Sequence, residues 1–150
     1  MSSEVNCFMA NVFDVATYII RYPSLNIDNL KLQKLLFYSQ AVTLVKTGVE
    51  LFTEEIQAWD YGPVVPVVYH KYKTNGDDYL ESEDEIKGLS DIELHCIDMT
   101  MEYYGEMSGA ALINLTHSEK PWQEAYAKGR NTVISISSMV DFYSKVLCFN

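Results

Sequence analysis

Apolar residues recur with helical spacing along most of the chain, which predicts a mainly α-helical fold. The stripe formed by Phe8, Val12, Val15 and Ile19 is typical of the first helix, which Pro23 ends. Helices are expected over residues 7–22, 28–46 and 64–73, from the capping box at Ser90, after Ser108, around Pro121, and after Ser137 or Ser138. We therefore expect a single domain over residues 1–150 with about six to seven helices.

The helix expected over residues 28–46 is apolar on two sides. Phe37 and Leu44 lie on one arc, while Leu32 and Leu36 lie nearly opposite. Asn26 or Asp28 can cap its start, and Gly48 can end it. A helix with this pattern is usually central, so we expect it to be buried on both sides.

The residues after this helix change to an alternating pattern. Residues 50–63 place Ile56 and Ala58 on one face and Trp59 and Tyr61 on the other, which predicts a short strand, either alone or as half of a hairpin. Gly62-Pro63 is expected to break it, and residues 132–136 form a second extended segment. The predicted class is thus mainly α with one or two short strands.

The other expectations on packing concern residues 77–104. Six carboxylates lie between positions 77 and 85; we call this segment the acidic run and expect it to be solvated and mobile. The helix that opens at Ser90 is expected to bury Leu89, Ile92, Cys96, Met99 and Tyr103.

Composition and charge narrow the classes of function. The formal net charge is −10, which disfavours nucleic acid and anionic membranes as partners. The three cysteines are widely spaced, as in reduced cytosolic proteins, and the sequence shows neither a signal peptide nor a membrane-spanning apolar run. We expect a cytoplasmic protein that binds neither DNA, RNA nor membrane.

Residues that could carry chemistry are sparse. His70, His95 and His117 have no partners at metal-ligand spacing, and no phosphate-binding glycine motif occurs, so we expect no metal, no cofactor and no enzymatic activity. His117 lies among Thr116, Ser118 and Glu119, either as a helix end before a Ser118 cap or as part of an active site.

Two further features leave alternatives open. Lys31 and Lys34 project onto the apolar arc of the central helix, where they either extend to solvent near its end or reach a carboxylate across an interface. The run from Trp59 to Tyr72 concentrates aromatic residues and prolines, as in a core-lining turn or a contact surface.

Three motifs in these regions resemble one family. Residues 30–40, LKLQKLLFYSQ, are similar to the signature LKLQKLLYFAQ of the SocA-like antitoxin family, also called the Panacea domain. Residues 56–69, IQAWDYGPVVPVVY, resemble its IEAWxYGPVVPxVY, and residues 116–122, THSEKPW, resemble its THxxxPW. The match extends over about residues 8–146.

The resemblance implies an antitoxin that binds and neutralises a cognate protein toxin in two-gene systems of bacteria and phages. One branch of the family implies an alternative, a proteolytic adaptor that delivers the toxin to a Clp-type AAA+ protease. The rival from another class is a hydrolase that uses His117 and a neighbouring carboxylate. The family supplies no catalytic residues, and its motifs indicate as candidate partner-binding residues Lys31, Gln33, Lys34, Trp59, Tyr61, Gly62, Pro63, His117, Pro121 and Trp122.

Overall fold

The computed structural model describes residues 9–149 and confirms the mainly α-helical class. Within these residues there are seven α-helices, one 3₁₀ turn and a small antiparallel sheet with strand order β2-β1-β3. In chain order the elements are α1 (Val12–Ile20), α2 (Asn29–Thr47), β1 (Gln57–Trp59), β2 (Gly62–Val64), α3 (Pro66–Tyr72), η2 (Lys73–Asn75), α4 (Asp91–Tyr104), α5 (Gly109–His117), α6 (Lys120–Ala127), β3 (Thr132–Val133) and α7 (Ile136–Val146).

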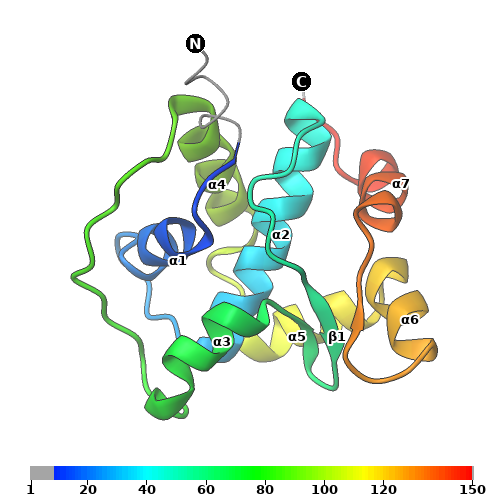
Figure 1. The fold of residues 1–150 in the computed structure, drawn as a ribbon, viewed down its shortest axis with the longest axis horizontal. Helices are drawn as coiled ribbons and strands as arrows, with labels where there is room; N and C mark the ends of the chain where they lie inside the picture. The colour runs from blue at the N-terminus through cyan, green and yellow to red at the C-terminus, as the bar shows by residue number, and fades with distance from the viewer. Residues whose placement is uncertain (1–8, 150) are drawn as a thin grey trace.

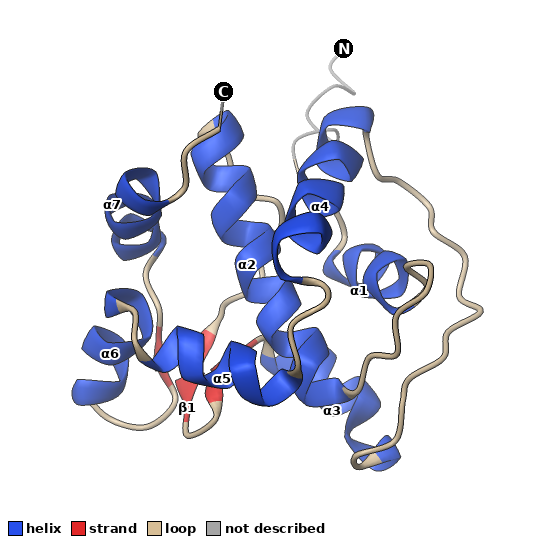
Figure 2. Ribbon diagram, turned by 180° about the vertical axis from the view of Figure 1, so that it is seen from behind, coloured by secondary structure: helices blue, strands red, loops and turns tan. Residues whose placement is uncertain are grey.

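Helix α2 is the centre of the molecule, as expected. In Figure 1 it runs between α1 and α4 on one side and α7 on the other, and Figure 2, seen from the opposite side, shows α5 crossing it there. Every residue from Lys31 to Leu44 is buried, and both Leu32 and Leu36 are fully inaccessible. The two-sided apolar pattern of α2 therefore correctly predicted a helix that is buried on all sides.

Side-chain caps begin α2, α4 and α5 where the sequence predicts them. Asp28 caps α2 by accepting a hydrogen bond from the Lys31 amide, and Ser90 forms the capping box of α4. The predicted caps of α7 are wrong: Ser135 caps it, because the helix already begins at Ile136. Helix α1 begins only at Val12, and the predicted contributions of residues 7 and 8 lie outside the described residues.

Strands β1 and β2 form a hairpin, which is one of the two arrangements expected for residues 50–63. Their register pairs Trp59 with Gly62, so Asp60 and Tyr61 form a two-residue turn. The expected break at Gly62-Pro63 is wrong, because these residues begin β2. Strand β3 pairs with the other edge of β1.

The buried polar residues of α2 bind backbone groups of the segment that follows it. This segment has few sheet partners, so side chains satisfy its buried amides and carbonyls. The contacts are Gln33 Oε1 accepting from Val65 N (2.9 Å), Lys34 Nζ donating to Pro63 O (2.9 Å), Gln40 Oε1 accepting from Leu51 N (2.6 Å) and Gln40 Nε2 donating to Phe52 O (2.8 Å).

Lys34 fits neither of the two alternatives for the lysines of α2. Its side chain is fully buried, and its amine reaches a carbonyl, not solvent or a carboxylate. Burial lowers the pKa of Lys34 to about 7, an effect that the charge of Asp28 only partly offsets. The fold thus keeps an amine of near-neutral pKa in its core.

The predicted buried face of α4 is wrong at two of its five residues. Cys96 is buried, and Leu89 and Met99 pack half-buried against the core, but Ile92 and Tyr103 are exposed. The buried face is instead turned toward Ile97, Met101 and Tyr104, which join Cys96 at helical spacing. Thr100 also lies on this face, and its hydroxyl donates to the Cys96 carbonyl within the helix.

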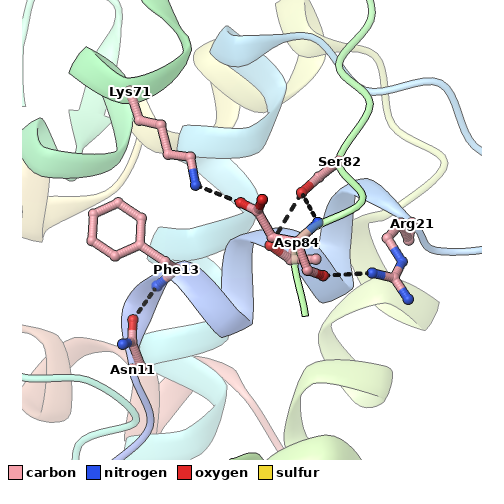
Figure 3. Close-up of polar contacts among 7 residues, drawn as sticks. Asn11, Phe13, Arg21, Lys71, Ser82 and Asp84 are labelled. Carbon is pink, nitrogen blue, oxygen red and sulfur yellow. Dashed lines mark hydrogen bonds and ion pairs between the residues drawn. The ribbon is translucent and has the colours of Figure 1, made fainter. Parts of the chain in front are cut away.

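The acidic run is largely exposed, as expected, but it is also anchored at several points that the sequence did not predict. Leu80 is buried, and its amide donates to the Ile27 carbonyl at 2.8 Å. In Figure 3, Asp84 joins two helices: its carboxylate accepts from Lys71 Nζ at 2.6 Å, and its carbonyl accepts from the Arg21 guanidinium at 2.9 Å. The sequence missed these anchors because Leu80 is a lone apolar residue without a period.

Leu80→Ala should lower the free energy of unfolding by about 2 kcal/mol or more, because it removes a buried apolar anchor. Tyr79→Ala is the matched control: its side chain is 64% exposed, so its replacement should change stability by less than about 0.5 kcal/mol. Urea unfolding of both variants measures the difference. Equally small losses would show that Leu80 anchors nothing.

The buried amine of Lys34 should make stability rise with pH above about 7. The unfolded chain keeps this proton up to the ordinary pKa of 10.5, whereas the folded chain releases it at about 7. The unfolded state therefore binds more protons in this window, and folding gains up to about 1.4 kcal/mol per pH unit.

Urea unfolding at about pH 7, 8 and 9 measures this effect against Lys34→Met, which removes the titrating group. The unfolding free energy of the native chain should rise with pH relative to that of the variant, because only the native chain carries the titrating amine. A difference that stays constant would contradict the burial of a titrating amine.

Candidate functional site

The β1–β2 turn presents an aromatic side chain to solvent. Tyr61 is 64% exposed, whereas Gly62 and Pro63, which follow it, are buried. Gly62 has a φ of 104°, which side chains rarely adopt, so the turn needs glycine there. The turn thus combines a fixed backbone with an accessible ring.

A hollow of about 310 Å³ lies beside Tyr61; we call it the turn hollow. Three aromatic side chains contribute to it, and Trp59 and Tyr69 meet edge to face at 5.0 Å. Its lining consists of Leu30, Trp59, Asp60, Tyr61, Val64, Tyr69, Arg130 and Asn131. Concave surfaces that combine aromatic and polar side chains are where proteins bind ligands and partner side chains.

Charged groups at the turn hollow neutralise one another. Asp60 accepts from Tyr126 Oη at 2.5 Å and from the Arg130 guanidinium at 3.0 and 2.8 Å. The Tyr126 hydrogen bond, followed by the charge of Arg130, lowers the pKa of Asp60. The carboxylate is therefore ionised and already paired.

Beneath the hairpin, the first two turns of α2 supply a connected set of polar side chains. Gln33 donates to Asn29 Oδ1 at 2.9 Å, and Asn29 donates to the Tyr69 carbonyl at 3.2 Å. Together with the bonds from Gln33 to Val65 and from Lys34 to Pro63, they hold β2 and α3 from the core side. Of the candidate residues, Gln33 and Lys34 are therefore part of the support below the surface.

Gly62 makes the closest approach to this support. A Cβ atom at this position would lie 2.6 Å from Lys34 Cε and 2.9 Å from Thr116 Oγ1. The hairpin therefore rests directly on the lysine side chain and on α5.

The third motif meets the hairpin through Trp122. Its indole nitrogen donates to the Trp59 carbonyl at 2.9 Å, and its ring stacks on His117 with centroids 4.1 Å apart. Pro121 is buried in the first turn of α6. The structure thus brings the second and third motifs together, although some sixty residues separate them.

His117 shows no arrangement that supports the hydrolase alternative. Within the described residues its buried Nε2 atom has no hydrogen-bond partner. The neighbouring Glu119 instead accepts from Tyr38 Oη at 2.6 Å and from Tyr143 Oη at 2.7 Å. Burial raises the pKa of Glu119, and the two tyrosine bonds oppose that rise. This carboxylate fastens α2 to α7 and is not hydrogen-bonded to the histidine.

Lys31 lies apart from the turn hollow. Its side chain packs near the start of α5, with Cβ 3.9 Å from where a side chain of Gly109 would begin. It is mostly buried, and this burial lowers its pKa. Of the ten candidates, only Trp59 and Tyr61 line the hollow.

The remaining lining residues were not among the candidates. Asp60 and Tyr69 lie inside the second motif and Leu30 opens the first, so inspection of those motifs could have found them. Arg130 and Asn131 lie outside all three motifs and arrive only through the pairing of β3 with β1, for which the sequence carries no signal.

Residues 9–149 contain no group of three or more His, Cys, Asp or Glu side chains placed to hold a metal ion. In the same part of the chain, no helix has both the length and the apolar character required to cross a membrane.

Comparisons with known proteins agree with the three motifs. The family model described as "Antitoxin SocA-like, Panacea domain" matches residues 32–123, more than half of the chain. Antitoxin SocA of Caulobacter vibrioides (strain NA1000 / CB15N) is 33% identical over 123 residues, covering 73% of this chain. The chain spans 65% of the length of that curated relative. No solved structure matches. Because the family model matches more than half of the chain, the chain belongs to the SocA-like antitoxin family, which is defined by the Panacea domain.

Proposed function

We propose that this chain is an antitoxin that binds a protein toxin directly and neutralises it, with the turn hollow and Tyr61 as the contact surface. Family membership and the name of the Caulobacter relative support the antitoxin role. The proposal places the encounter in the cytoplasm, where Cys96 and Cys148 remain free thiols.

We choose this surface because Tyr61 is exposed. Tyr61 is an aromatic residue of a family motif, and the two residues that follow it are buried, so packing of the core does not explain why a tyrosine stands at the exposed position. Tyrosine and tryptophan anchors often contribute most of the free energy of protein–protein binding. A turn already fixed by its supports loses little entropy on docking.

The overall charge favours a basic partner. The chain carries a net charge of −10, and the charges at the turn hollow are internally paired. Long-range attraction would therefore speed the encounter with a positively charged toxin, while the aromatic side chains of the turn hollow provide the local fit.

Coexpression of the chain should rescue cells from the toxin encoded in the adjacent gene, and Tyr61→Ala should abolish the rescue. Loss of a central aromatic anchor is expected to weaken binding by about tenfold or more. Titration calorimetry with the purified toxin measures the change. Circular dichroism confirms that the variant is folded.

Tyr79→Ala is the matched control, because both tyrosines are 64% exposed. It should rescue as well as the native chain. If folded Tyr61→Ala also rescues and binds normally, the contact lies elsewhere. Repeating the rescue in a host without Clp-type proteases tests the adaptor alternative: neutralisation by contact persists there, whereas delivery for degradation fails.

A further inference from the structure

We propose that Lys34 is a positioning residue for toxin recognition: it holds the Pro63 carbonyl from below and so fixes the turn that presents Tyr61. The inference rests on the proposed function, because it assigns a role at the same site.

The topology leaves β2 dependent on side chains. In the sheet order β2-β1-β3, this strand is at an edge, and it packs against α2. Proline has no backbone N–H, so the carbonyl is the hydrogen-bonding group that Pro63 offers. Lys34 Nζ donates to that carbonyl at 2.9 Å, in a fully buried position.

Core stability does not explain the lysine. A buried amine costs free energy that an apolar side chain of similar length would not. Strand β2 and helix α5 face it with Gly62, Pro63 and Thr116, which do not titrate. Asp28, at the N-cap of its own helix, is the charged group that acts on it. The feature that distinguishes Lys34 from an apolar residue is therefore its bond to the hairpin.

The bond is close enough to control the turn. Pro63 is two residues from Tyr61, and the intervening Gly62 leaves no room for a Cβ atom beside the lysine side chain. Gly62 also pairs with Trp59, which lines the turn hollow. Release of the Pro63 carbonyl would therefore free both Tyr61 and the wall formed by Trp59.

Lys34→Met tests the role, because methionine keeps the length of the side chain but cannot donate. We expect the variant to remain folded and to bind the purified toxin, the product of the adjacent gene, about tenfold more weakly than the native chain does. Amide exchange of residues 57–65 should accelerate about tenfold, with exchange in α4 unchanged. Thr100→Val, which removes another buried hydrogen-bonding group away from the hairpin, should change neither measurement.

Gly62→Ala disturbs the same contact from the other side, so its own effect on binding and on amide exchange of residues 57–65 can be measured even if Lys34→Met is poorly folded. If both act through the turn, their combined effect on binding should be smaller than the product of the single effects. Independent, multiplying effects would contradict the proposal.

The two proposals fail in different ways. If Lys34→Met binds normally with unchanged exchange while Tyr61→Ala does not bind, the positioning role is wrong and the contact surface stands. If neither variant weakens binding, the surface itself is wrong.

Discussion

The structure depends on one constraint: helix α2 is buried around its whole circumference, yet it carries polar side chains. An unpaired buried polar group is costly, so the long polar side chains need partners inside the protein. Asn29, Gln33, Lys34 and Gln40 find partners in backbone groups between residues 51 and 69. The central helix therefore organises a segment that would otherwise have few hydrogen bonds of its own.

This arrangement gives the hairpin two different faces. Its inner face is fixed by α2 and by Thr116, while its outer face leaves Tyr61 and the turn hollow open. The family motifs consequently mix two kinds of residue. Gln33, Lys34, Gly62 and Pro63 build the support. The aromatic residues around the turn form the surface, and the support holds this surface in place.

The sequence predicted elements whose signals are local. The capping box at Ser90 and the two-sided apolar pattern of α2 depend on neighbouring residues only, and both are confirmed. Contacts between distant segments were not predictable in this way. The partner of Lys34 depends on the course of the hairpin, Arg130 reaches the turn hollow through β3, and the acidic run is held by a lone buried Leu80.

The most direct test of the account is amide hydrogen exchange of the chain with and without its purified toxin. Contact through the turn hollow predicts that added protection concentrates in residues 57–70 and at 130–131. Protection confined to the acidic run or to α4, with the hairpin unchanged, would contradict it.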